Sequence, residues 1–157
     1  MPYALKPIDD RYFEDAPNVI PATVELAATP EQVWEALGSD RMWSWVPAID
    51  QLRWTTPRGE NGIRILRLGK FVTIEEEFYR WEPPHRATFR VTRQSRQVFD
   101  GLAEDFRLEP TASGGTRLTW TMAQGLRGVP GGGALGPLKG LMAKGNAAGI
   151  GGIKTIL

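Results

Sequence analysis

The sequence contains no cysteine and only one histidine, and both shortages exclude particular kinds of chemistry. Without cysteine the chain forms no disulfide, offers no thiolate to a metal ion and has no thiol nucleophile. The single histidine, His85, stands in the segment "EPPHR", so the chain has no set of histidines with the spacing of metal ligands. We therefore expect a fold that needs neither a metal ion nor disulfides.

The sequence also lacks long apolar runs and a marked excess of either positive or negative charge. No apolar stretch approaches the length of a membrane-spanning helix, and "MPYALKPIDD" at residues 1–10 lacks the pattern of a secretory signal. Basic residues number 19 against 18 acidic residues, and they form no stripe for nucleic acid. The segment "GVPGGGALG" lacks the Lys-Ser/Thr pair of a phosphate loop. These features predict a cytoplasmic protein with no integral membrane segment, no nucleic-acid partner and no cofactor.

Tryptophan, in contrast, is plentiful. The chain has 157 residues, 41% of them apolar, which suits one domain with its own core. In "SDRMWSWVPAI" the residues Trp43 and Trp45 lie two positions apart, directly after a predicted helix that already carries Trp34. A short core helix rarely needs so many large aromatic side chains. They line either a packed interior or a space that the protein keeps open.

The N-terminal half begins with an arm, residues 1–18, which is rich in proline and acidic residues and predicts a loop that wraps a domain over residues 19–157. "VIPATVELA" alternates as a strand does. In "TPEQVWEALG", Thr29 suits the N-cap of a helix, Gln32 completes a capping box and Gly38 suits the C-terminal end. A second short helix is expected through the Trp pair, ended by Pro47.

From residue 50 to residue 124 the pattern has a period of two, and turn-like joins divide it. Six strands are expected, near 50–55, 62–68, 71–81, 86–94, 97–109 and 116–124. The final segment, "ALGPLKGLMAKGNAAGIGGIKTIL", returns to the period of a helix. Grouped strands followed by a helix predict an α+β fold with one curved antiparallel sheet of about seven strands.

Three segments of the chain resemble the START-like helix-grip (SRPBCC) superfamily, most closely its polyketide cyclase/dehydrase and lipid transport group. "ATPEQVWEALGS" is similar to its first-helix signature, "EEFYRWEPPHRATFRV" to its Pro-Pro hairpin and "GGTRLTWTM" to its last strand. The resemblance covers about residues 10–157 with the element order intact. It implies a sheet wrapped around a long C-terminal helix, commonly with a cavity for an apolar ligand.

The predicted C-terminal helix bears on that cavity, because its expected buried face carries Gly145, Gly149 and Gly152. Glycine inside a helix costs about 1 kcal/mol relative to alanine. These glycines allow a close approach to the sheet, leave free volume, or mark a helix that is frayed or partly disordered. For three on one face we favour a hollow, with Trp45 facing outward or covering its entrance. The other residues expected to line it are Trp43, Trp54, Phe71, Phe89, Trp120, Met122 and Met142.

Strand alternation also selects candidate acid–base residues. The apolar positions of 71–81 turn Glu76 inward, and those of 97–109 turn Glu104 and Asp100 inward. A carboxyl group among apolar neighbours has a raised pKa and can serve as an acid or base, so Glu76 and Glu104 are the catalytic candidates. The alternatives are an ion pair, for instance with Arg64, or a position at the wet rim of the sheet. His85 lies in a turn, where a structural role is expected.

Three functions remain open on the sequence. The leading hypothesis is binding of a small hydrophobic molecule, such as a lipid, a fatty-acyl chain or an aromatic polyketide, in an internal cavity. The second is a polyketide cyclase or dehydratase that uses a carboxylate of the cavity as acid or base. The third is a protein–protein interaction module. Fold alone does not choose among them.

Overall fold

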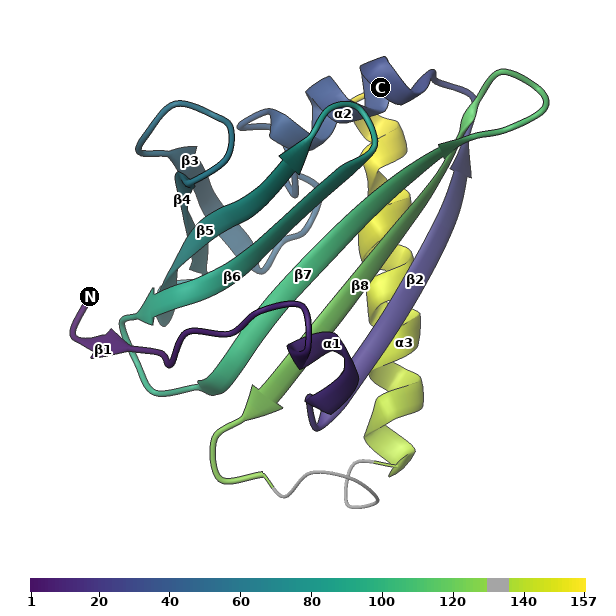
Figure 1. The fold of residues 1–157 in the computed structure, drawn as a ribbon. Coiled ribbons are helices and arrows are strands. Elements are labelled where there is room, and N and C mark those ends of the chain that lie inside the picture. The colour runs from purple at the N-terminus through teal and green to yellow at the C-terminus, as the bar shows by residue number, and fades with distance from the viewer. Residues whose placement is uncertain (130–135) are drawn as a thin grey trace.

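The structure is a computed structural model that describes residues 1–129 and 136–157. One antiparallel sheet dominates it, and the sheet curls into a half-barrel around the C-terminal helix (Figure 1). Seven strands follow one another in the order β2-β8-β7-β6-β5-β4-β3, and an eighth, β1, pairs with β6. The α+β helix-grip fold predicted from the sequence is confirmed. The strands are β1 (Tyr3–Ala4), β2 (Asn18–Leu26), β3 (Ile49–Trp54), β4 (Gly62–Leu68), β5 (Val72–Glu82), β6 (Arg86–Gln94), β7 (Phe99–Pro110) and β8 (Thr116–Leu126).

Alternating side chains explain which face of the sheet is concave. In β4, buried Arg64 and Leu66 alternate with the partly exposed Ile63 and Ile65, and β2 and β8 follow the same period along much of their length. Buried apolar side chains of these strands, among them Ala22, Leu66 and Trp120, pack together with Trp34, Trp43 and Ile153 into one apolar cluster. Burial of this cluster is the main favourable term in folding.

The helices are α1 (Tyr12–Asp15), α2 (Pro30–Gly38) and α3 (Gly136–Gly151), followed by the 3-10 helix η2 (Gly152–Thr155). The capping box predicted for α2 is present, because Thr29 Oγ1 accepts from the Gln32 backbone and the Gln32 side chain accepts from the Thr29 backbone. α3 lies alongside β2 on the concave side of the sheet (Figure 1).

The prediction of a second short helix after α2 is wrong. Residues 40–45 form successive turns, in which Ser44 N–H bonds to Arg41 O and Val46 N–H bonds to Trp43 O. Trp43 itself has a φ of 68°, in the left-handed region that a helix excludes. This backbone turns both indole rings, Trp43 and Trp45, toward α3, with their centroids 5.7 Å apart.

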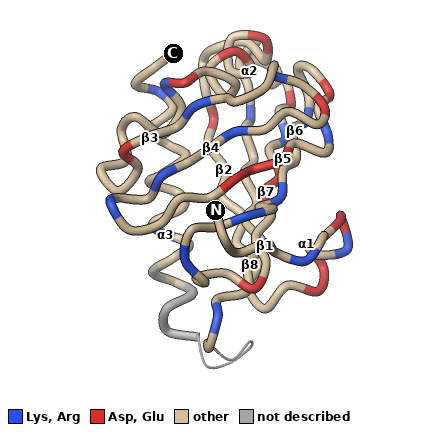
Figure 2. Tube along the Cα trace, turned by 90° about the vertical axis from the view of Figure 1, so that its left-hand side faces the viewer, with Lys and Arg blue, Asp and Glu red and all other residues tan. Residues whose placement is uncertain are grey.

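The N-terminal arm is more ordered than the loop predicted for it. The pairing of β6 with β7 ends at Arg90 and Ala103, and beyond that point β1 takes the place of β7 beside β6. In α1, the ring of Tyr12 packs against Gly101 and Gly125, where a side chain would collide with it or press closely on it. The arm thus closes the sheet where β6 and β7 separate. Charged residues of both signs lie interspersed over the molecule (Figure 2).

Candidate functional site

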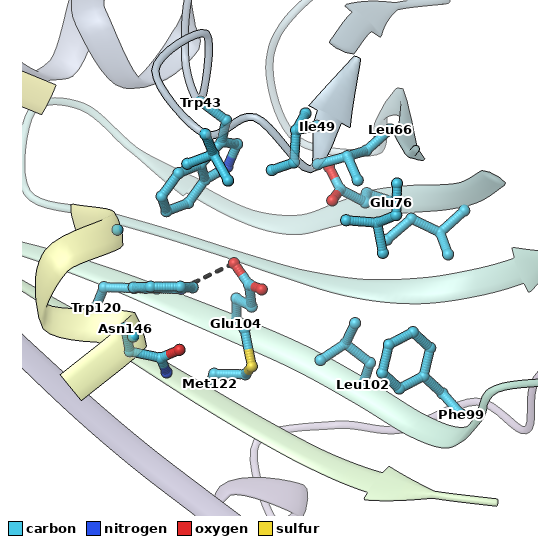
Figure 3. Close-up of a pocket in the computed structure, with 15 residues that line it drawn as sticks. Trp43, Ile49, Leu66, Glu76, Phe99, Leu102, Glu104, Trp120, Met122 and Asn146 are labelled. Carbon is cyan, nitrogen blue, oxygen red and sulfur yellow. Dashed lines mark hydrogen bonds between the residues drawn. The ribbon is translucent and has the colours of Figure 1, made fainter. Parts of the chain in front are cut away.

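A cavity of about 230 Å³ lies between the concave face of the sheet and α3 (Figure 3). Its deep end is formed by buried side chains, Trp43, Leu66, Ile74, Leu102 and Trp120. Partly exposed residues line the rest, Val46, Ile49, Leu68, Phe99 and Met122, and the cavity is partly open to solvent. The lining is therefore mostly apolar, as in sites for small organic molecules.

Two carboxyl groups interrupt this apolar lining, one from β5 and one from β7. Glu76 and Glu104 are 2% and 7% exposed, and both side chains point into the space (Figure 3). Period-two alternation accounts for both positions, since their strands turn the neighbouring apolar side chains the same way.

The Glu104 carboxyl group accepts a hydrogen bond from one side chain among the described residues. Trp120 Nε1–H donates to Glu104 Oε2 over 2.8 Å. The pKa of Glu104 is raised to about 8, mainly by burial and then by the nearby charge of Glu76, whereas the Trp120 hydrogen bond and the Arg64 charge act in the opposite direction. At neutral pH the carboxyl group of Glu104 is consequently protonated for most of the time.

Glu76 is held by an ion pair instead. Arg64 Nε lies 2.6 Å from Glu76 Oε2, and both side chains are about 2% exposed. The pKa of Glu76 is raised overall, because the effect of burial outweighs the lowering by the Arg64 guanidinium. The Arg64 guanidinium also lies 4.9 to 5.6 Å from the ring centroids of Trp54, Phe78 and Phe89. With Glu104 protonated, the buried set of Arg64, Glu76 and Glu104 has no net charge.

The α3 side of the cavity is made by glycines and one amide. Gly145 and Gly149 line the space, and a Cβ at Gly149 would meet Trp120 and Trp43 at ordinary contact distances of 3.7 and 3.8 Å. Asn146 lies between them in the sequence and its side chain enters the cavity (Figure 3). Its Nδ2 atom is buried and has no hydrogen-bond partner among the described residues.

Trp45 ties α3 to the tryptophan cluster. Its Nε1–H donates to Gly149 O over 2.7 Å. Gly152 leaves the space for this indole, because a Cβ at position 152 would overlap Trp45 Cδ1 and Nε1. Of the three glycines predicted to border a hollow, Gly145 and Gly149 line the cavity and Gly152 instead permits close packing.

Residues 19–157 match the family model "Polyketide cyclase / dehydrase and lipid transport". The chain belongs to this family. A relative from Mycobacterium tuberculosis, an uncharacterized protein, is 40% identical over 120 residues, which cover 74% of this chain and 71% of that protein. Membership of the family thus rests on the family model, which spans residues 19–157.

Solved structures share the fold of the family at low sequence identity. A START superfamily protein from Mycobacterium smegmatis has a TM-score of 0.69 and 17% identity, covering 88% of this chain and 99% of that one. DynU16, a protein of the dynemicin biosynthetic locus, has a TM-score of 0.64 and 20% identity. Their alignment covers 87% of this chain and 46% of DynU16. At these identities the likeness shows the helix-grip fold alone.

Most residues predicted for the site lie around one cavity of this family member. The structure brings together Glu76, Glu104, Trp43, Trp120, Met122, Gly145 and Gly149. Their roles in binding or catalysis stay predictions. Trp45, expected outside or over the entrance, is partly buried against the cluster.

Four predicted lining residues lie elsewhere. Phe71 follows the β4–β5 turn and is 73% exposed, because it precedes the first paired residue of β5. Trp54 and Phe89 surround the Arg64 guanidinium on the far side of the ion pair. Met142 is partly buried, one helical turn before Gly145 and Asn146, and is not among the described residues that line the cavity.

Two polar predictions have definite outcomes. Asp100, expected inside, is exposed, because a bulge between Phe99 and Gly101 shifts the register of β7 and turns Phe99 inward instead. His85 is exposed in the turn between β5 and β6, the position predicted for it, and its structural role stays a prediction.

Some lining residues were not predicted, although a signal for them existed. Leu66 and Leu68 follow the alternation of β4, and Asn146 lies three residues before Gly149 on the same face of α3. Val46 and Ile49 follow the unexpected turns after α2, so no periodic pattern marks them.

No group of three or more His, Asp or Glu side chains suited to hold a metal ion occurs in the described part of the chain. Within residues 1–129 and 136–157, no helix has the length and apolar character to cross a membrane.

Proposed function

We propose that the protein binds a small hydrophobic molecule, of the lipid, fatty-acyl or aromatic polyketide type, in the cavity under α3. One observation carries this proposal, namely the space of about 230 Å³ with apolar walls and a few polar groups. An apolar cavity of about 150 Å³ accommodates benzene, so the present one suits one or two fused rings or a short acyl segment. The description of the family, which joins cyclases and dehydrases with lipid transport, supports the same class of ligand.

Filling the cavity tests this function. A Leu side chain at Gly149 would extend from a Cβ already in contact with Trp43 and Trp120 and occupy the cavity. The matched control is Gly140→Leu, because Gly140 is exposed on the same helix with open space around its Cβ position. Both variants gain a leucine in α3, but only Gly149→Leu removes cavity volume.

The measurement is native mass spectrometry of freshly purified protein, together with calorimetric titration of naphthalene as an apolar probe. We expect an apolar adduct or naphthalene binding in the wild type and in Gly140→Leu, and neither in Gly149→Leu. Melting curves show whether each variant is folded. Absence of an adduct and of naphthalene binding in the wild type would contradict the proposal.

A second candidate function is acid–base catalysis on a carbonyl compound, as in a cyclase or dehydratase. The observation that favours it is Glu104, whose pKa of about 8 lies close to working pH inside the cavity. In its ionised form Glu104 would accept a proton from the carbon next to a carbonyl group and then return it. Glu76 is less suited to this role, because its carboxylate already forms an ion pair with Arg64.

Deuterium exchange separates catalysis from binding alone. The methyl protons of 2-acetylnaphthalene exchange in D2O when a base removes them, and proton NMR follows their loss at pH 8. An enzyme accelerates this exchange above the buffer rate, and Glu104→Gln abolishes the acceleration while the fold persists. Exchange at the buffer rate with bound 2-acetylnaphthalene would leave binding as the function and exclude Glu104 as its base.

A further inference from the structure

Two polar groups from different elements face the same apolar cavity. Glu104 comes from β7 and Asn146 from α3, and Figure 3 shows both side chains entering the space beside Trp120 and Met122. Neither group is part of the Arg64–Glu76 ion pair. A cavity that served hydrocarbon alone would gain nothing from them, because buried polar groups without partners are costly.

The free oxygen of Glu104 is a hydrogen-bond donor at neutral pH. Trp120 Nε1–H occupies Oε2, and Oε1 has no partner among the described residues. The pKa of about 8, raised by burial, keeps a proton on the group below that pH. Since Oε2 already accepts a hydrogen bond, the proton belongs on Oε1, where it is available to a ligand.

Asn146 contributes a second donor. Its Nδ2 atom is buried and unpaired within the described part of the chain, although almost all buried polar atoms in folded proteins have a partner. The atom requires an acceptor, and the neighbouring cavity is the place from which a ligand supplies one.

We propose that the ligand carries a carbonyl oxygen that accepts hydrogen bonds from the Glu104 carboxyl group and the Asn146 amide, while its hydrocarbon part fills the apolar cavity. A carbonyl oxygen has two lone pairs, so it satisfies both donors at once. This inference rests on the proposed binding function and names the ligand class, a ketone, aldehyde or quinone. It also assigns Asn146 as a residue that determines specificity.

A carboxylate ligand fits these groups less well than a carbonyl. It would lie near the Glu76 carboxylate, and no Lys or Arg lines the cavity among the described residues. The nearby Arg64 is already paired with Glu76 and enclosed by aromatic rings. An ammonium ligand would pair with ionised Glu104 but would leave the Asn146 donor without an acceptor. The neutral carbonyl accepts from both Glu104 and Asn146 without adding a buried charge.

Two probes of the same shape test this inference. In 2-acetylnaphthalene a methyl ketone is attached to two fused rings, and in 2-isopropenylnaphthalene a CH2 group replaces the ketone oxygen. Calorimetric titration at pH 6 gives the ratio of their dissociation constants for each variant. In Asn146→Leu and in Glu104→Met one donor is removed, and each is expected to reduce the preference for the ketone by about tenfold.

Two further variants make the result specific. Glu104→Gln supplies a neutral N–H donor and still accepts from Trp120, so it is expected to restore the ketone preference that Glu104→Met loses. Ala147→Leu places a leucine at an exposed position next to Asn146 and is expected to leave the ratio unchanged. Melting curves exclude loss of fold as the cause of any change.

The outcomes separate this inference from the proposed function. One outcome is that both probes bind with the same ratio of dissociation constants in the wild type, Asn146→Leu and Glu104→Met. That result would contradict the proposal of a carbonyl ligand and leave the proposal of apolar binding intact. If neither probe binds the wild type, both proposals are overturned at this ligand size. A ratio that falls in the two donor-deleting variants and returns in Glu104→Gln supports the inference.

Discussion

Three ionisable side chains lie together in the interior, Arg64, Glu76 and Glu104. Only two of them form a short ion pair, so the third stays neutral to avoid an isolated buried charge. Glu104 keeps its proton through desolvation and through the negative charge of Glu76. A single protonation state of one residue thus sets the net charge of the deep end of the cavity.

The stability of the protein should consequently depend on the protonation of Glu104. Its pKa is about 8 when folded against 4.5 as the reference value, so the folded chain holds a proton that the unfolded chain releases. The free energy of unfolding therefore falls as pH rises from about 4.5 to about 8, by up to about 1.4 kcal/mol per pH unit, and levels off above that range.

Urea unfolding at pH 5, 7 and 9 measures this dependence in the wild type and in Glu104→Gln. Glu76, whose pKa is also raised, is present in both proteins, so the difference between the two profiles reports Glu104. We expect the stability of Glu104→Gln relative to the wild type to rise steadily with pH. Parallel profiles would show that Glu104 has an ordinary pKa.

The Arg64–Glu76 pair allows a second prediction at the residue scale. Arg64→Met or Glu76→Met leaves one charge buried without its partner and should cost about 3–5 kcal/mol. The double variant removes both charges and should be less destabilised than the sum of the single variants. Urea unfolding of the four proteins gives the coupling energy, and additive losses would contradict a buried ion pair.

At the scale of elements, α3 combines glycine with the tryptophan cluster in two different ways. Gly149 borders free volume, whereas Gly152 makes room for the indole of Trp45. The Trp45 hydrogen bond to Gly149 O then holds the end of the helix against the turns after α2. The same residue type therefore serves a hollow at one position and tight packing one turn later.

Gly152→Ala should destabilise the protein, because its Cβ would displace the Trp45 ring and break that hydrogen bond. We expect a loss of about 1–3 kcal/mol and a shift of tryptophan emission toward that of exposed indole. The control is Gly151→Ala, which meets nothing within 4 Å and should be neutral or stabilising. Equal melting temperatures of the two variants would be inconsistent with this packing.

At the scale of the molecule, the N-terminal arm completes the half-barrel. β6 leaves β7 after Arg90, and the backbone of the arm continues the pairing, with Leu5 N–H donating to Thr92 O. Arg90 Nη1 reaches Ile8 O, and Tyr79 donates to Asp10 over 3.0 Å. The arm is therefore part of the folded unit and covers backbone groups that would otherwise form an open edge.

Removal of residues 2–11 should expose this edge and cost on the order of 3 kcal/mol, since several hydrogen bonds of about 1 kcal/mol each are lost. Hydrogen exchange should accelerate at Thr92 and Gln94, the residues of β6 whose backbone groups face the arm, more than in β2 and β8. Tyr79→Phe removes only one contact of the arm and should have a small effect. Unchanged exchange in β6 would show that the arm does not pair with it.

Much of this architecture follows from local sequence. Period-two alternation determined the strands and the inward direction of Glu76 and Glu104, and the short joins determined the antiparallel pairing. Thr29 with Gln32 determined the start of α2. These features depend on neighbours within a few residues, so a single chain segment contains the necessary information.

Other features required the tertiary structure. The bulge at Phe99 reversed the side of Asp100, and the left-handed backbone of Trp43 replaced the expected helix with turns. The pairing of Arg64 with Glu76, the β1–β6 ladder and the placement of Trp45 on Gly149 join residues far apart in the sequence. The cavity belongs to this second group, because its volume is the space left between the curled sheet and α3 after their side chains have packed. No local sequence pattern determines the size of that space.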